Sequence, residues 1–315
     1  MKVFAPGKLV LTGAYAVLGG APAIVMATDR GAYADDSRPN PSPSVEVRHA
    51  FGGDTASPHV DASSLFDGSR KLGLGASAAI LVASLGALEA ARGADLSAAD
   101  VRSRLFERAR AAHAAAQNGG SGVDVAASVH GGVLEYVPGV AKPRKLPSGT
   151  VVHVFACGTS ARTSELRARV DAFAAASPAA YRPCIDDLAT IAHDAASAVQ
   201  RGDHDAFIGA IRRAARALAR LSAGANAGIV PQGFDALEDL AVAEGAAFCV
   251  SGAGGGDVAT FVGSAPPTAA FVKRALEQGL FVIDVKLDEK GVRAATQSSG
   301  ALWSAGSAAE ATSSS

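Results

Sequence analysis

Residues 71–85 read KLGLGASAAILVASL, and they combine two glycines and one serine with an apolar run that has almost no polar face. The pattern predicts a buried helix from residue 77 to about residue 92 that begins directly after a glycine turn. The first N–H groups of a helix have no intrahelical partners and carry the positive end of the helix dipole, so they attract anions where glycine lets the backbone come close. Taken alone, the stretch fits a phosphate site and a structural turn capped by Ser77 about equally well.

The composition indicates a globular protein with a small partner. The chain has 315 residues, of which 49% are hydrophobic, so it is long enough for two domains. The net charge of -1 argues against nucleic acid or an anionic membrane as a partner. The cysteines, Cys157, Cys184 and Cys249, are too few and too far apart for a disulfide framework or a zinc site. The N-terminus has no continuous signal-type apolar core, so we expect a cytoplasmic protein, either a monomer or a homodimer.

Breaks in the pattern predict two domains. Residues 1–150 form the first, which ends at the polar stretch KPRKLPSG, and residues 151–303 form the second. The second reads strand, helices, two strands, helix, strand, which is the order of a ferredoxin-like domain. Residues 304–315 hold too little apolar surface to order themselves. Residues 35–64 are rich in Pro, Ser, Asp and Gly and predict a loop or flap, in which only VEVRHAF resembles a strand.

A second glycine cluster, SGAGGGD at residues 251–257, lies between two short apolar strands. A two-residue hairpin turn needs at most two residues with positive φ, whereas four of the five residues 252–256 are glycine. The excess favours a backbone that passes close to a ligand over a merely flexible turn.

Two charged residues in otherwise apolar surroundings complete a possible site. Asp124 follows the turn NGGSG, where a carboxylate can cap a helix or act as a general base. Lys8 lies inside the apolar run of APGKLVLTGAY, where it can either reach solvent or pair with Asp124. Two glycine loops, a hydroxyl able to touch a metal ion, a lysine and a carboxylate are the groups that phosphoryl transfer needs.

A dinucleotide site is the rival interpretation of the first loop. Gly73, Gly75 and Ala78 fit the relaxed fingerprint G-x-G-x-x-G/A. That fingerprint follows a buried strand, whereas LFDGSR precedes it in this chain. The nicotinamide or flavin interpretation is therefore disfavoured.

Three stretches, PGKLVLTGAYAVLGG, KLGLGASAA and SGAGGGD, resemble in order the three motifs of the GHMP small-molecule kinases. The resemblance implies an α+β protein with a two-domain GHMP kinase fold. Its N-terminal domain would be of the ribosomal-protein-S5-like α/β type and its C-terminal domain ferredoxin-like, with ATP bound between them and Mg²⁺ required.

The resemblance also assigns roles to residues of this chain. Asp124 would be the catalytic carboxylate, Lys8 its charge partner and Ser77 a metal ligand. The residues that it places around ATP are Lys71, Leu72, Gly73, Leu74, Gly75, Ala76, Ser77, Ala78 and Ala79. The loop that it places at the phosphates or the substrate is Ser251, Gly252, Ala253, Gly254, Gly255, Gly256 and Asp257. The residues that it places at the acceptor are Tyr15, Gln117, Ser121, Gly122 and Ser160.

Within the family, AHAAAQNGGSGVDVAAS and SARTSEL are similar to the members whose acceptor already carries a phosphate. Members that act on mevalonate itself typically have a metal-binding glutamate before the aspartate motif, and this chain has no Glu between Glu107 and Glu135. The resemblance therefore implies ATP-dependent phosphorylation of mevalonate 5-phosphate, a step in isoprenoid precursor synthesis. Mevalonate or another sugar or alcohol as acceptor is one alternative, and a non-catalytic relative that binds a metabolite or nucleotide is another.

The chain departs from the family pattern within two of the motifs, and its residues 28–70 are short and polar compared with the family's usual substrate-side elements. Gly13-Ala14-Tyr15 stands where the family usually has Gly-Glu-Tyr or Gly-Glu-His, and Ala76-Ser77 replaces a doubled serine. These changes bear on the acceptor more than on ATP. The candidates to neutralise the acceptor phosphate are Lys71, Arg162 and Lys142, and the sequence does not rank them. We expect His113 to be an ordinary helix residue.

Overall fold

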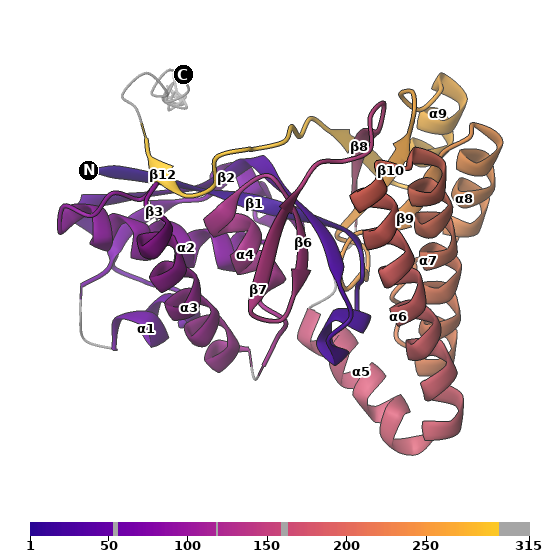
Figure 1. The fold of residues 1–315 in the computed structure, drawn as a ribbon, viewed down its shortest axis with the longest axis horizontal. Coiled ribbons are helices and arrows are strands. Elements are labelled where there is room, and N and C mark those ends of the chain that lie inside the picture. The colour runs from indigo at the N-terminus through magenta and orange to yellow at the C-terminus, as the bar shows by residue number, and fades with distance from the viewer. Residues whose placement is uncertain (53–55, 118, 159–162, 296–315) are drawn as a thin grey trace, which may run out of the picture.

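The computed structural model describes residues 1–52, 56–117, 119–158 and 163–295 (Figure 1). It contains two lobes, each built on an antiparallel sheet, which lie side by side in Figure 1. Ser160 and the tail 304–315, which we predict to be disordered, lie outside the described residues.

The first lobe holds a sheet of order β12-β1-β2-β6-β7, with β3 paired to β2. Its strands are β1 (Lys2–Thr12), β2 (Ala23–Pro39), β3 (Pro58–Asp61), β6 (Val133–Val137), β7 (Val140–Arg144) and β12 (Arg293–Ala294). The pairing of β1 with β2 shifts register between Pro6 and Gly7, one residue before Lys8. Such a shift redirects the side chains that follow it, because neighbouring residues of a strand point to opposite faces.

Helices cover one side of this sheet (Figure 1). They are α1 (Val45–Phe51), α2 (Ala76–Ala91), α3 (Ala99–Ala116) and α4 (Val123–His130). The short elements of this lobe are η1 (Ala16–Gly19), which lies between β1 and β2, and η2 (Ser63–Leu65), β4 (Phe66–Asp67) and β5 (Arg70–Lys71), which lie between α1 and α2. Helix α2 packs against β1, β2, α3 and α4, which explains why its sequence has almost no polar face. The helix predicted from residue 77 to about residue 92 is confirmed within one residue at each end.

The second lobe holds a sheet of order β11-β8-β10-β9. Its strands are β8 (Val151–Cys157), β9 (Ala247–Val250), β10 (Val258–Gly263) and β11 (Leu280–Ile283), and its helices are α5 (Thr163–Ala176), α6 (Pro178–Arg201), α7 (His204–Ala225), α8 (Phe234–Ala243) and α9 (Ala269–Glu277). The strand order and the all-antiparallel pairing are those of a ferredoxin-like sheet, with α5 to α8 inserted after β8.

The chain then returns to the first lobe. Strand β12 pairs with β1, and the backbone N–H of Asp29 donates to the Lys286 carbonyl at 2.8 Å. Residues 293–294, which fall in the range expected for the second domain, therefore complete the first sheet.

The prediction for residues 35–64 is wrong in part. Strand β2 continues to Pro39 and pairs with β3, and VEVRHAF forms helix α1 instead of a strand. Ser44 caps this helix by accepting from Val47 N at 3.4 Å, and Val47 and Phe51, one turn apart, bury the same face. The cap and this spacing decide the local structure over the β propensity of valine.

The three cysteines are free, and two of them, Cys157 and Cys249, are buried. In the described residues, no helix combines the length and the hydropathy that crossing a membrane requires.

Candidate active site

Lys8 lies between the first glycine loop and Asp124. Its backbone N–H donates to the Leu74 carbonyl at 2.8 Å, and its Nζ donates to the Gly73 carbonyl at 3.2 Å. The Nζ lies 4.0 Å from Asp124 Oδ2, and Lys8 is buried, with only 7% of its surface exposed. A Cβ on Gly75 would lie 2.9 Å from Lys8 Cγ, so the absence of a side chain there lets the lysine stem pass. The structure thus brings together the pair that the sequence suggested.

The first glycine loop packs closely against the second. Gly73 and Gly75 have φ values of 72° and 79°, in the left-handed region that favours glycine. A Cβ on Gly73 would lie 2.4 Å from the Cβ of Asp257. Gly75 is the N-cap of α2, and within the described part of the chain no side chain caps that helix. Its first amides are therefore available to an anion at the junction of the two loops.

The second glycine loop is held in a defined conformation. Its glycines all have φ between 71° and 91°, namely Gly252, Gly254, Gly255 and Gly256. A Cβ on Gly254 would lie 2.2 Å from the Ile229 carbonyl, so this glycine is needed for packing. A Cβ on Gly252 would lie 3.6 Å from Lys8 Nζ, so this glycine faces the lysine. Close packing against the Ile229 backbone therefore explains part of the glycine excess, namely the glycine at position 254.

Two hydrogen bonds join the second loop to the first lobe. Val10 N donates to Ser251 Oγ at 3.0 Å, and Tyr15 Oη donates to the Ala253 carbonyl at 2.8 Å. Burial raises the pKa of Tyr15 well above its ordinary value, which keeps the hydroxyl protonated and able to donate. Tyr15 also has a φ of 62°, which is uncommon for a residue other than glycine. The loop is therefore fixed relative to β1 and Lys8.

Asp124 stands in the first turn of α4, directly after Gly122 and Val123. This helix is anchored to β1, because Ser128 Oγ donates to the Pro6 carbonyl at 2.7 Å and both groups are buried. Pro6 is the residue at the register shift. One buried hydrogen bond thus connects the helix that carries Asp124 to the strand that carries Lys8.

A cavity of about 160 Å³ opens beside Lys8 and Asp124 and receives residues from both lobes. The sequence-predicted acceptor residues Tyr15, Gln117, Ser121 and Gly122 all line it, as does His113. The other polar or charged residues of its wall are Lys8, Asp124, Thr163, Ser164 and Arg167. Ala14, where the family usually has glutamate, also lines this cavity.

Gln117 is oriented by two neighbours. Its Nε2 is 3.4 Å from Glu46 Oε1 and 3.1 Å from His113 Nε2. Because a carboxylate accepts hydrogen bonds, Glu46 fixes the amide nitrogen of Gln117 on its own side. Helix α1, which we expected to be a strand, thereby helps to orient one residue of the cavity wall.

Two of the three basic residues proposed from sequence for the acceptor lie outside the wall of the cavity. Lys71 and Lys142 are exposed and are not among its lining residues, and Arg162 lies outside the described residues. Arg167 lines the cavity instead. Sequence reasoning missed it because a basic residue in an amphipathic helix usually faces solvent, although it directly follows the motif SARTSEL.

Ser77 lies half-buried in the first turn of α2. The described residues contain no cluster of three or more His, Cys, Asp or Glu side chains able to hold a metal. Mg²⁺ commonly takes one or two protein oxygens and completes its shell with phosphate and water. A hydroxyl at a helix start suits a cation shared with a nucleotide better than a resident metal.

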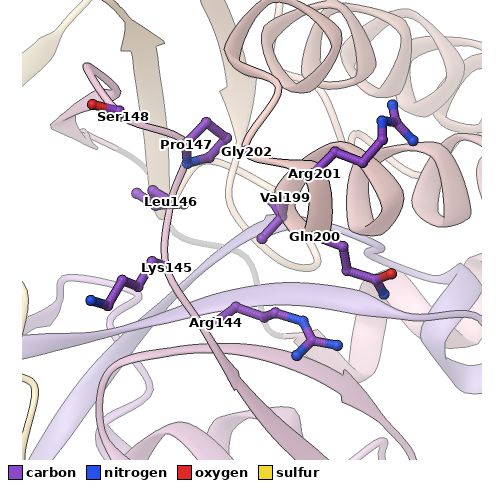
Figure 2. Close-up of a pocket in the computed structure, with 9 residues that line it drawn as sticks. All are labelled: Arg144, Lys145, Leu146, Pro147, Ser148, Val199, Gln200, Arg201 and Gly202. Carbon is purple, nitrogen blue, oxygen red and sulfur yellow. The ribbon is translucent and has the colours of Figure 1, made fainter.

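A second hollow of about 500 Å³ lies away from these residues, between the β7–β8 connection and the end of α6 (Figure 2). It shares no lining residue with the cavity beside Lys8. Its wall includes Arg144 and Gln200, which come from opposite lobes. Arg144 and Gln200 both donate hydrogen bonds to Glu135, so this region connects the two lobes.

Comparison with known proteins finds a family match for part of the chain. Residues 49–132 match the family model described as the GHMP kinases N terminal domain. The matched range includes the motif KLGLGASAA, so this part of the chain is similar to the N-terminal domain of that family, in agreement with the resemblance seen in the motifs.

The relatives include a phosphomevalonate kinase. The curated phosphomevalonate kinase of Streptomyces sp. (strain CL190) is 33% identical over 220 residues, which cover 62% of this chain and 58% of that protein. A crystal structure of the Lin0012 protein from Listeria innocua aligns with a TM-score of 0.79 at 22% identity, covering 93% of this chain and 98% of that one. Streptococcus pneumoniae phosphomevalonate kinase, solved with phosphomevalonate and AMPPNP, aligns with a TM-score of 0.74 at 18% identity, covering 91% and 99%. The chain therefore shares the overall fold of these two solved structures.

Proposed function

We propose that this protein transfers the γ-phosphoryl group of ATP to an acceptor that already carries a phosphate, and that the acceptor is mevalonate 5-phosphate. The observation that carries the proposal is the convergence on Lys8 of the two glycine loops and Asp124, beside a cavity walled by both lobes. The 33% identity to a phosphomevalonate kinase supports this choice of acceptor.

The nucleotide half of the proposal rests on backbone groups. Residues 71–79, which comprise the first glycine loop and the uncapped start of α2, offer N–H donors to a triphosphate, and the second glycine loop, 251–257, packs against them. Ser77 would hold Mg²⁺, which when bound neutralises phosphate charge. Lys8 stands where negative charge builds up on the transferring group and stabilises it electrostatically.

The part of the proposal that concerns the acceptor rests on the protonation state of its attacking oxygen. A phosphate monoester has a second pKa near ~6, so at neutral pH it is mostly a dianion and needs no base to become a nucleophile. The oxygen of that phosphate attacks the γ-phosphorus, the bond to the β-phosphate oxygen breaks, and ADP leaves. Asp124 would then chiefly orient Lys8, whereas an alcohol acceptor would need a carboxylate to take its proton.

The experiment compares acceptors directly. ADP release is measured with Mg²⁺ and ATP in the presence of mevalonate 5-phosphate, mevalonate, homoserine or galactose. The proposal predicts the highest kcat/KM for mevalonate 5-phosphate. A preference for an unphosphorylated alcohol would replace that acceptor, and nucleotide binding without turnover on any of the four would favour a non-catalytic binder.

The variant Asp124→Asn tests the role of the carboxylate. It keeps the size of the side chain and removes its charge and basicity. We expect a loss of kcat of about tenfold to a hundredfold with mevalonate 5-phosphate, smaller than the ~10²–10⁴-fold that a general base contributes. Steady-state kinetics give this loss. Activity equal to that of the unaltered protein would remove Asp124 from the mechanism.

A further inference from the structure

Arg167 projects from the first half of α5 into the wall of the cavity beside Lys8 and Asp124. Its side chain is 35% exposed, and its ion-pair partner in the described part of the chain is Asp171, one turn along the same helix. The two are joined through Arg167 Nε at 3.7 Å, and the Asp171 side chain is 67% exposed. Ion pairs of this exposed kind contribute little free energy, so this pair does not occupy the guanidinium.

The opposite wall has a recess that fits the guanidinium. Gly119 has a φ of 105°, and a Cβ on it would lie 3.2 Å from Arg167 Nη1 and 3.3 Å from Nη2. Any larger residue would push the two Nη groups away. Gly119 belongs to the first lobe and Arg167 to the second, so the contact forms where the lobes meet over the cavity.

The charges of the cavity wall favour an anion. Among its described residues the fixed charges are Lys8 and Arg167 against Asp124, and Lys8 already lies 4.0 Å from that carboxylate. Arg167 is therefore the cation that the wall leaves uncompensated. A guanidinium presents paired N–H donors that match the oxygens of a phosphate or a carboxylate.

We propose that Arg167 is the counter-ion of an anionic group of the acceptor and makes the site select acidic acceptors. This inference rests on the proposed function of the same site. The anionic group can be a phosphate or a carboxylate, since mevalonate 5-phosphate carries both and mevalonate carries only the carboxylate. Both groups present anionic oxygens to the guanidinium, and the test below distinguishes binding through the phosphate from binding through the carboxylate.

The test measures acceptor affinity by calorimetry in the full-length protein. The titrants are mevalonate 5-phosphate, mevalonate and the non-hydrolysable nucleotide AMPPNP with Mg²⁺. The variants are Arg167→Gln, Arg167→Lys and, as a matched control, Arg169→Gln, whose guanidinium faces the Asn226 carbonyl at 3.5 Å on another side of α5. Thermal unfolding checks that every variant is folded.

We expect Arg167→Gln to weaken mevalonate 5-phosphate binding by about tenfold to a hundredfold, as loss of a charge-assisted hydrogen bond does. The affinity of Arg167→Lys for mevalonate 5-phosphate should lie between the affinities of Arg167→Gln and the unaltered protein. The affinity for AMPPNP should not change in either variant. A loss for mevalonate 5-phosphate alone assigns Arg167 to the phosphate, and an equal loss for both acceptors assigns it to the carboxylate.

Acceptor affinities of Arg167→Gln within about twofold of the control would overturn the inference and leave the proposed function intact. Failure of the unaltered protein to bind either acceptor would overturn both. A drop in AMPPNP affinity equal to the drop in acceptor affinity would also overturn the inference, because it would mean a general loss of structure at the site.

Discussion

Lys8 is the residue on which both glycine loops and the carboxylate converge. We predict that Lys8→Met, which keeps the aliphatic stem, lowers kcat by about 10²–10³-fold, the cost of deleting one preorganised donor. The KM for ATP should change less, because the charge acts mainly on the transition state. Steady-state kinetics decide this.

Lys142→Met is the matched control for Lys8→Met, since Lys142 is exposed on β7 and lies outside the cavity wall. It should leave kcat unchanged. An increase in KM without any fall in kcat in the Lys8 variant would show that Lys8 only binds the substrate.

Local sequence patterns were sufficient to single out the residues that the structure brings together around Lys8. Lys8 stands out as a charge in an apolar strand, and Gly73 and Gly75 stand out as glycines directly before a buried helix. Arg167 gave no such signal, because its partner Gly119 belongs to another lobe and the contact depends on how the lobes meet. Contacts of this kind leave no periodicity in the sequence.

At the scale of elements, the glycine loop before α2 carries the site. Gly73→Ala places a Cβ 2.4 Å from the Asp257 Cβ and forces the two loops apart. We predict that it raises the KM for ATP by more than tenfold. Since a non-glycine residue in the left-handed region also costs about 1–2 kcal/mol, unfolding in denaturant should show a loss of stability of at least that size.

Gly93→Ala separates these two effects. Gly93 has a similar φ of 83°, and a Cβ there meets nothing within 4 Å. This variant should lose about 1–2 kcal/mol of stability and keep its KM for ATP. Equal KM values for ATP in Gly73→Ala and Gly93→Ala would contradict the placement of nucleotide phosphates at the Gly73 loop.

Elements with a strong local pattern were predicted better than elements that depend on distant pairing. Helix α2 was found from its apolar run, and the order of strands and helices in the second lobe matches the prediction. Helix α1 was mistaken for a strand, because Val45 and Val47 have high β propensity and seven residues are too few to show a helical period. Strand β12 was missed, since two residues paired with the N-terminus carry no pattern of their own.

For the whole molecule, Glu135 joins the lobes away from the cavity. Its Oε2 accepts from Arg144 Nε at 2.9 Å, in the first lobe, and from Gln200 Nε2 at 2.9 Å, in α6 of the second. Arg144 and Gln200 both line the hollow shown in Figure 2. Burial raises the pKa of Glu135, but the hydrogen bonds from Gln200 and Arg144 and the charge of Arg144 outweigh it and lower the pKa overall.

This shift predicts a pH dependence of stability. A carboxyl group whose pKa is lower in the folded state stabilises the fold above its unfolded pKa, near ~4.3 for glutamate, and the effect is lost as the pH falls through the folded pKa. Glu135→Gln should therefore cost about 1–3 kcal/mol at pH 7 and progressively less below pH ~4. Denaturant unfolding at several pH values measures both.

Glu277→Gln is the control for Glu135→Gln, because Glu277 pairs with Arg274 at 3.5 Å on an exposed surface. Glu277→Gln should change the free energy of unfolding by no more than about 0.5 kcal/mol at every pH. A cost of Glu135→Gln that stayed constant down to acid pH would contradict the role of its charge.

The most direct test of the central claim is a ³¹P NMR record of the purified protein mixed with ATP, Mg²⁺ and mevalonate 5-phosphate. The account predicts that the γ-phosphate signal of ATP disappears while the signals of ADP and of a second, organic diphosphate appear together, and that Lys8→Met slows this conversion. An unchanged ATP spectrum, or release of inorganic phosphate without a new diphosphate, would contradict it.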